Sequence, residues 1–219
     1  MVSLVAVSAR LLPAASHYCI RAVVTGTMDW TRELSAARTM TPADPPLIDD
    51  TSAAVLAALQ GLGVAFETLA CDPALADTAD FCRHYDVPLA NSANVIVVAG
   101  KSEPRQYAAC VLLADTRLDV NKRVRKTMGV RRISFASAEE TRMLTGMEIG
   151  GVTALGLPES LPLWVDQRVM GCDYIILGGG SRSLKLKLSP AVFHCTPNTT
   201  VVEGLALAPD EEKISPRSD

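Results

Sequence analysis

Three consecutive glycines, Gly178 to Gly180, follow a short apolar run and precede Ser181 and Arg182. Glycines in such a place let backbone N–H groups approach a phosphate, as in dinucleotide and P-loop sites. The next segment, 184–189, alternates Leu with Lys, which predicts a strand. Both nucleotide-loop interpretations are excluded, because each needs a helix after its glycines. A hairpin connection is favoured, and its backbone amides can still contact a ligand.

A second glycine-rich segment spans 146–158 and holds four glycines, one threonine and one proline. It lies between a predicted helix and a predicted strand, where most connections need only about 4–6 residues. Long glycine-rich loops on a rigid scaffold commonly hold ligands. The pattern is compatible with ligand contact and equally with a purely structural loop.

A basic cluster follows Asp119, on a helix whose apolar stripe is Val120, Val124 and Met128. Its members are Lys122, Arg123, Arg125, Lys126, Arg131 and Arg132, which Ser134, Arg182 and Lys185 could extend. Because the stripe faces the core, these side chains face water, either as a solvated surface or as a patch that contacts phosphates. The formal net charge of −3 argues against a whole surface built for nucleic acid.

Standard catalytic arrangements are absent from the sequence. The three histidines lie far apart, none of them in metal-binding spacing, and no G-x-S-x-G motif occurs. Six dispersed cysteines, without a C-x-x-C pair, predict reduced thiols in the cytoplasm. No window of eighteen apolar residues predicts a membrane span. An enzyme with this sequence works without a metal, another cofactor or an obvious triad.

The organisation of the chain predicts one folded domain at 47–206, with a poorly structured N-terminal appendage at 1–45 and a flexible C-terminal tail at 207–219. Caps and glycine stops predict helices near 52–60, 77–85, 119–128 and 137–146. Apolar or alternating runs predict strands at 64–70, 93–99, 106–114, 161–166, 173–178 and 184–189. The fold class is therefore mixed α/β.

Several segments in this order resemble the YbaK/EbsC family of aminoacyl-tRNA trans-editing domains, relatives of the insertion domain of bacterial prolyl-tRNA synthetases. The resemblance covers about 50–195. The matching segments are LDVNK at 118–122, the glycine loop from Thr145 to Gly156, LPLWVD at 161–166, and 178–182 with 188–190. A glycine loop followed closely by this LP…VD pattern is more specific than a single glycine motif.

The resemblance implies a single-domain, YbaK-like fold, with a curved mixed β-sheet flanked by helices and a pocket beside the loop Gly150–Thr153. It implies hydrolysis of the ester of a mischarged aminoacyl-tRNA, without a metal and with help from the hydroxyl of the terminal adenosine. The expected partners are the acceptor end of tRNA and an aminoacyl-tRNA synthetase, and neither DNA nor a membrane.

The resemblance also assigns residues. The catalytic set is Gly150, Gly151, Val152, Thr153 and Asp166, and the substrate-binding or tRNA-binding set is Asn94, Lys122, Arg125, Gly179, Gly180, Ser181 and Arg182. The two loop glycines would let amides approach the ester carbonyl.

Thr153 would offer its hydroxyl to the substrate or the water. Asp166 would orient the substrate amine or the loop, or cap a turn. Two positions depart from the family: Asn94 replaces a lysine that meets the tRNA end, and Ala154 replaces a proline. A non-catalytic module that binds a tRNA end, a nucleotide or a protein is the alternative.

Overall fold

The computed structural model describes residues 48–208. The predicted appendage at 1–45 and the tail beyond 208 lie outside this range. The helices are α1 (Asp50–Leu62), α2 (Thr78–Tyr85), α3 (Arg125–Met128) and α4 (Ala138–Thr145). The strands are β1 (Phe66–Ala70), β2 (Ala93–Gly100), β3 (Tyr107–Leu113), β4 (Arg117–Leu118), β5 (Ile133–Phe135), β6 (Leu163–Asp166), β7 (Ile175–Gly178), β8 (Leu184–Leu188), β9 (Thr199–Val202) and β10 (Ala206–Leu207).

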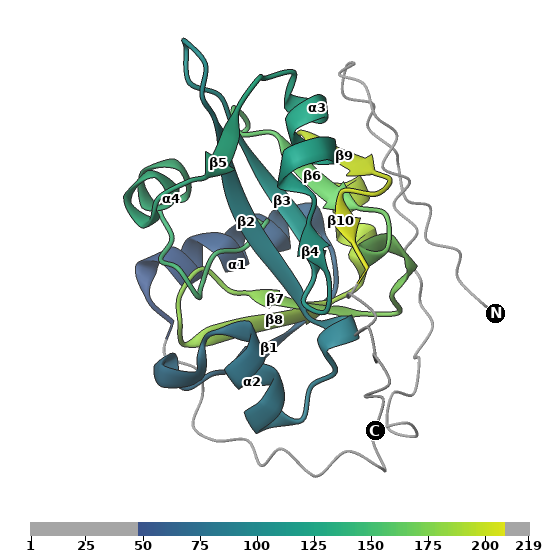
Figure 1. The fold of residues 1–219 in the computed structure, drawn as a ribbon. Coiled ribbons are helices and arrows are strands. Elements are labelled where there is room, and N and C mark those ends of the chain that lie inside the picture. Colours follow the sequence, from purple (N-terminus) through teal and green to yellow (C-terminus); the bar gives the residue numbers. More distant parts are fainter. Residues whose placement is uncertain (1–47, 209–219) are drawn as a thin grey trace, which may run out of the picture.

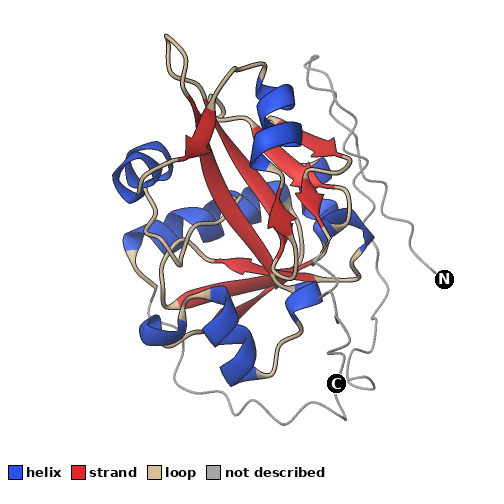
Figure 2. Cartoon of the chain, viewed as in Figure 1, coloured by secondary structure: helices blue, strands red, loops and turns tan. Residues whose placement is uncertain are grey.

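The strands form two main sheets, with helices around them (Figures 1 and 2). The larger sheet has the order β5-β2-β3-β6-β9, in which β6 runs parallel to both of its neighbours and β2 antiparallel to both of its own. The smaller, antiparallel sheet has the order β1-β8-β7. An isolated parallel bridge between Ser92 and Ile176 joins the two sheets. The mixed α/β fold is confirmed.

Helix α1 begins two or three residues earlier than its sequence indicates. The carboxylate of Asp49 accepts the N–H of Ser52 at 2.7 Å, so Asp49 and not Thr51 or Ser52 is the N-cap. The hydroxyl of Ser52 is thereby free to donate to Ser181 Oγ at 2.8 Å. The predicted stop is confirmed, because Gly63 adopts the left-handed conformation that ends helices.

The basic helix starts at Asp119, as predicted. The Asp119 carboxylate accepts the N–H groups of Lys122 and Arg123, and the first turn, 120–124, is a π-helix that continues into α3. Gly129 ends α3 with a φ of 72°. Val124 is fully buried in a core on the outer face of the larger sheet.

The main core lies between the two sheets and under α1. Leu184, Leu186 and Leu188 enter it from β8, as the alternating pattern predicts. An alternating strand commonly has one face in water, but α2 packs over this face of the smaller sheet with Phe81 and Cys82. Lys185 is consequently buried, with only 5% of its surface exposed.

Helix α4 offers a direct test of a local signal. The Ser137 hydroxyl accepts the N–H of Glu140, and the Glu140 carboxylate accepts the N–H of Ser137, which completes a capping box. Replacing Ser137 by Ala should lower the free energy of unfolding by about 1 kcal/mol. Urea unfolding measures this, with the exposed Ser160→Ala as the control, for which we expect no change. Equal stability of both variants would contradict the cap.

Candidate functional site

The two glycine-rich segments pack directly against each other. Gly180 donates its N–H to Gly151 O at 2.9 Å. A Cβ on Gly151 would lie 2.5–2.8 Å from the backbone of Ser181, and a Cβ on Gly178 would lie 2.6 Å from the carbonyl oxygens of Gly151 and Val152. Only glycine therefore fits at 151 and 178. The turn between β7 and β8 is a hairpin, as the sequence predicts.

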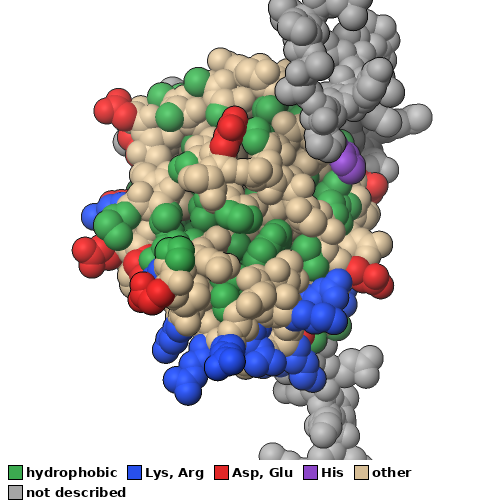
Figure 3. Space-filling model, turned by 90° about the horizontal axis from the view of Figure 1, so that it is seen from above, with side chains coloured by type: hydrophobic (Ala, Val, Ile, Leu, Met, Phe, Trp, Pro, Cys, Tyr) green, Lys and Arg blue, Asp and Glu red, His purple; other side chains and the backbone are tan. Residues whose placement is uncertain are grey.

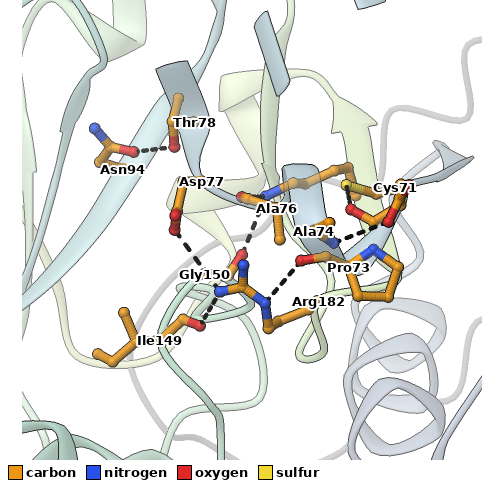
Figure 4. A network of polar contacts seen from close by, with 12 residues as sticks. Cys71, Pro73, Ala74, Ala76, Asp77, Thr78, Asn94, Ile149, Gly150 and Arg182 are labelled. Atoms are coloured by element: carbon orange, nitrogen blue, oxygen red, sulfur yellow. Dashed lines mark hydrogen bonds and ion pairs between the residues drawn. The ribbon is translucent and has the colours of Figure 1, made fainter. Parts of the chain in front are cut away.

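Arg182 fastens this pair of loops to the start of α2. Its Nε donates to Pro73 O and its Nη1 to Ile149 O, both at 2.9 Å, and Nη1 lies 3.7 Å from an oxygen of Asp77 (Figure 4). Gly150 has a φ of 92°, and a Cβ there would collide with this guanidinium. The glycine loop is thus held in place by a side chain from the hairpin.

A cavity of about 360 Å³ opens beside the glycine loop. Its walls come from α2, the first half of β2, the glycine loop and the smaller sheet. The lining residues are Asp77, Thr78, Ala79, Phe81, Ser92, Ala93, Asn94, Val95, Ile96, Ile149, Gly150, Val152, Ile176, Leu177, Gly178 and Lys185. Since β5 pairs with β2 only at Val98–Gly100, the cavity lies beside a stretch of β2 that β5 leaves uncovered.

Asn94 is oriented within this cavity by Thr78. The Thr78 hydroxyl donates to Asn94 Oδ1 at 2.5 Å (Figure 4). Among residues 48–208 the Asn94 NH₂ group has no acceptor, so its two donors remain for a ligand. Asn94 is therefore a neutral donor where the resemblance expects a cation.

Lys185 is the buried cation of the cavity wall. Its Nζ donates to Ala76 O at 2.6 Å and to Gly150 O at 3.1 Å. Burial lowers the pKa of the Lys185 ammonium below its ordinary value. This lysine joins the start of α2 to the glycine loop.

The structure brings some of the assigned residues together and separates others. Asn94, Gly150 and Val152 line the cavity, whereas the side of the loop that includes Gly151 faces the hairpin. Gly179, Gly180 and Ser181 are outside the lining, and Ser181 bonds α1. Gly151 N–H donates to Glu148 O, so this amide is engaged within the loop.

Thr153 and Asp166 are also outside the cavity lining. Thr153 is fully buried, and its Oγ1 has no hydrogen-bond partner among residues 48–208. The Asp166 carboxylate accepts the N–H of Arg168 at 3.0 Å and that of Ala206 at 2.7 Å. Of the two roles open for Asp166, these contacts match the cap of a turn.

The sequence pattern did not identify Lys185, Thr78 or Asp77 as cavity residues. The sequence predicts Lys185 only as an extension of the basic cluster, because an alternating strand normally has one solvated face. The signal that could have revealed it is the amphipathic helix α2, whose buried Phe81 and Cys82 need a surface to cover.

Exposed basic residues gather at the end of the molecule that carries α3. Lys122, Arg125, Lys126, Arg131 and Arg132 are exposed, and Arg123 is half-buried. Figure 3 shows Lys and Arg side chains along one edge of this end. The basic cluster therefore faces water, as predicted, but it is separated from the cavity by the length of β2.

Within residues 48–208, no group of three His, Cys, Asp or Glu side chains could hold a metal ion. Four cysteines in this part of the chain are free thiols, of which Cys71, Cys82 and Cys110 are buried. Cys195 is disulfide-bonded, so the prediction of reduced thiols is wrong for this residue. Burial raises the pKa of the Cys110 thiol to about 12.

None of the helices between residues 48 and 208 has the length and apolar character that a bilayer crossing requires.

The fold and the site define a mixed α/β domain with a glycine-walled cavity. The sequence model of the aminoacyl-tRNA editing domain matches residues 72–194, more than half of the chain. The chain therefore belongs to the aminoacyl-tRNA editing domain family, and the resemblance to a trans-editing domain is confirmed at this level.

Solved structures with the same fold are distant in sequence. Hypothetical protein APE2540 is 22% identical to this chain with a TM-score of 0.63, and the alignment covers 70% of this chain and 99% of that protein. A candidate trans-editing enzyme for prolyl-tRNA synthetase is 19% identical with a TM-score of 0.62, and the alignment covers 71% of this chain and 96% of that enzyme. A candidate signal transduction protein from Marinobacter aquaeolei VT8 is 18% identical with a TM-score of 0.50, and the alignment covers 71% of this chain and 30% of that protein.

The contact between the glycine segments predicts a position-specific loss of stability. Gly151→Ala should lower the free energy of unfolding by about 1–3 kcal/mol, because its Cβ meets the rigid backbone of Ser181. Gly61→Ala is the matched control, since nothing lies within 4 Å of the added Cβ in α1, and it should be neutral or stabilising. Chemical denaturation compares the two, and a stable Gly151→Ala protein would refute the close packing.

Proposed function

We propose that this protein is an aminoacyl-tRNA deacylase that acts in trans in the cytoplasm and hydrolyses the ester of a mischarged tRNA. The observation that carries the proposal is the cavity, which lies inside the family match and is walled by its glycine loop. At about 360 Å³ it is near the lower end of small-ligand sites, which suits a small acyl group.

The proposed chemistry needs positioning and no protein nucleophile. A water oxygen attacks the ester carbonyl carbon, and the electron pair of the C=O bond moves to the carbonyl oxygen. When the tetrahedral intermediate collapses, the ribose oxygen leaves with its bonding pair and takes up the proton that the attacking water has lost, which gives the free amino acid and intact tRNA. The neighbouring ribose hydroxyl orients the water, so that proximity supplies much of the rate.

The cavity residues have distinct roles in this proposal. The Asn94 NH₂ group binds the terminal adenosine, and Asp77 at the cavity rim attracts the α-ammonium of the amino acid. Gly150 and Val152 shape the wall against the acyl group. Thr153 acts as a positioning residue behind this wall, whereas Asp166 caps the turn after β6. Gly151, Gly179, Gly180 and Ser181 keep the loop rigid.

The outer face of β2 runs from the cavity to the core beneath the basic helix, where Val98 is fully buried. Asn94, Ile96 and Val98 share this face by alternation, and Phe135 on β5 stands opposite Val98. Phe135 is 58% exposed and offers a surface on which a base can stack. The acceptor stem would then reach Lys122 and Arg125, beside the other end of β2. A synthetase that supplies the mischarged tRNA is the proposed protein partner.

One observation favours a second function. Asn94 brings no charge to the place where the resemblance expects a lysine. A non-catalytic module that binds the tRNA end through the same cavity would need only the neutral donor.

The deciding experiment measures hydrolysis of tRNAs charged with Ala, Ser, Cys, Thr or Pro by the full chain, in the presence of EDTA. We expect turnover of at least one of these esters, because the cavity admits a small acyl group and no step needs a metal. The Asn94→Lys variant runs beside the natural protein. Turnover by the variant alone supports the binding module, and no turnover by either refutes the deacylase.

A charge-reversal pair tests the path of the tRNA. Lys122→Glu together with Arg125→Glu should raise KM about tenfold or more at low salt and reduce its salt dependence, with kcat unchanged. Arg83→Glu on α2 is the control, because this exposed arginine carries the same charge on another helix. An effect confined to Arg83→Glu would instead indicate that tRNA lies along α2.

A further inference from the structure

Lys185 lies at the buried end of the cavity, on the central strand of the smaller sheet. The side chain faces α2, and its Nζ lies 5.4 Å from the centre of the Phe81 ring. Only 5% of the residue surface is exposed. An ammonium at this depth has lost most of its hydration, which makes its remaining hydrogen bonds important.

The ammonium is only partly satisfied by the protein. It has three N–H donors, and the structure gives it two acceptors, Ala76 O and Gly150 O. Among residues 48–208, no carboxylate forms an ion pair with it; the nearby Asp77 pairs with Arg182 instead. A buried cation without a counter-charge is costly, and an electronegative ligand atom would offset that cost.

We propose that Lys185 donates its remaining N–H to the ester carbonyl oxygen of the bound aminoacyl group and stabilises the oxyanion that forms there. This assignment rests on the proposed deacylase function and adds a catalytic residue to it. The ammonium keeps its proton throughout: the electron pair of the carbonyl moves onto the oxygen that Lys185 binds, and returns when the ribose oxygen leaves.

The lining of the cavity favours a carbonyl oxygen over a phosphate. Phe81 and Ile176, which pack on the α2 side of the smaller sheet, line the cavity together with Lys185. This apolar lining suits an acyl group better than a hydrated dianion. One remaining N–H also matches one oxygen acceptor. The exposed basic cluster, at the far end of β2, is the better place for phosphates.

The same contacts fix the ammonium in advance of binding. Ala76 precedes α2 and Gly150 belongs to the glycine loop, so Nζ is held between the two walls of the cavity. A donor held in this way needs no reorganisation when charge develops on the substrate oxygen. Lys185 would thus supply from β8 the cation that Asn94 does not supply from β2.

The test compares Lys185→Met with Lys187→Met. Lys187 is on the same strand but outside the cavity lining, where it pairs with Glu67 and lies over Tyr174. Lys185→Met should lower kcat by about 100-fold or more, as the loss of one oxyanion donor does. Lys187→Met should leave kcat unchanged. A folded Lys185→Met protein with the natural kcat would overturn the proposal.

The binding of two stable probes tests the contact between Lys185 and the carbonyl oxygen independently of whether the protein is a deacylase. The first is 3′-(alanylamino)-3′-deoxyadenosine, an amide analogue that keeps the carbonyl, and the second has CH₂ in place of that carbonyl. Calorimetry should show about tenfold tighter binding of the carbonyl probe to the natural protein, and no preference in Lys185→Met. If the natural protein prefers the carbonyl probe but hydrolyses none of the charged tRNAs, the contact between Lys185 and the carbonyl is supported and the deacylase function is refuted.

The probes also decide the case in which Lys185→Met does not fold. In that case Lys185→Gln takes the place of Lys185→Met, because glutamine keeps a polar side chain beside the two carbonyls. A thermal melt establishes whether this variant is folded. If that variant also fails, the natural protein alone is informative. Equal affinity for the two probes would mean that the cavity holds no donor for the carbonyl, which overturns the proposal.

Discussion

The cavity depends on the close contact between the glycine loop and the β7–β8 hairpin, where glycines at 151 and 178 leave no side chain between the two backbones. Gly151 fits against Ser181, Gly178 fits against the carbonyls of Gly151 and Val152, and Gly180 donates to Gly151. Any Cβ at 151 or 178 would separate the segments. Because the segments cannot separate, Arg182 and Lys185 emerge from the hairpin and β8 at fixed places beside the loop, and both bind its carbonyls.

Helix α2 changes the electrostatics of the smaller sheet. A three-stranded sheet with one solvated face would leave Lys185 in water, but α2 covers this face and converts the lysine into a buried donor at the cavity. Burial of the charge lowers the stability of the fold, and this loss is offset only when a ligand oxygen accepts a hydrogen bond from the ammonium. Such local conflict between stability and chemistry is common at functional sites.

Local signals predicted most elements, and long-range contacts account for the rest. The capping box at Ser137, the cap at Asp119 and the stop at Gly63 are fixed by a few neighbouring residues, so they were predictable. Strands β5 and β9 are short, and each forms by pairing with a strand distant in the sequence, β2 and β6 respectively, which no local pattern reveals. Both glycine loops were identified, but the packing of Gly151 on the hairpin and the burial of Lys185 depend on segments distant in the sequence.

Helix α1 and strand β1 precede the matched segment 72–194, yet the site rests on them. Val55 and Leu59 belong to the main core, Ser52 bonds the hairpin at Ser181, and β1 covers one edge of β8. A fragment cut at the family boundaries would expose β8 as a bare apolar edge, which invites aggregation. The minimal autonomous unit of this domain is therefore longer than the matched segment 72–194.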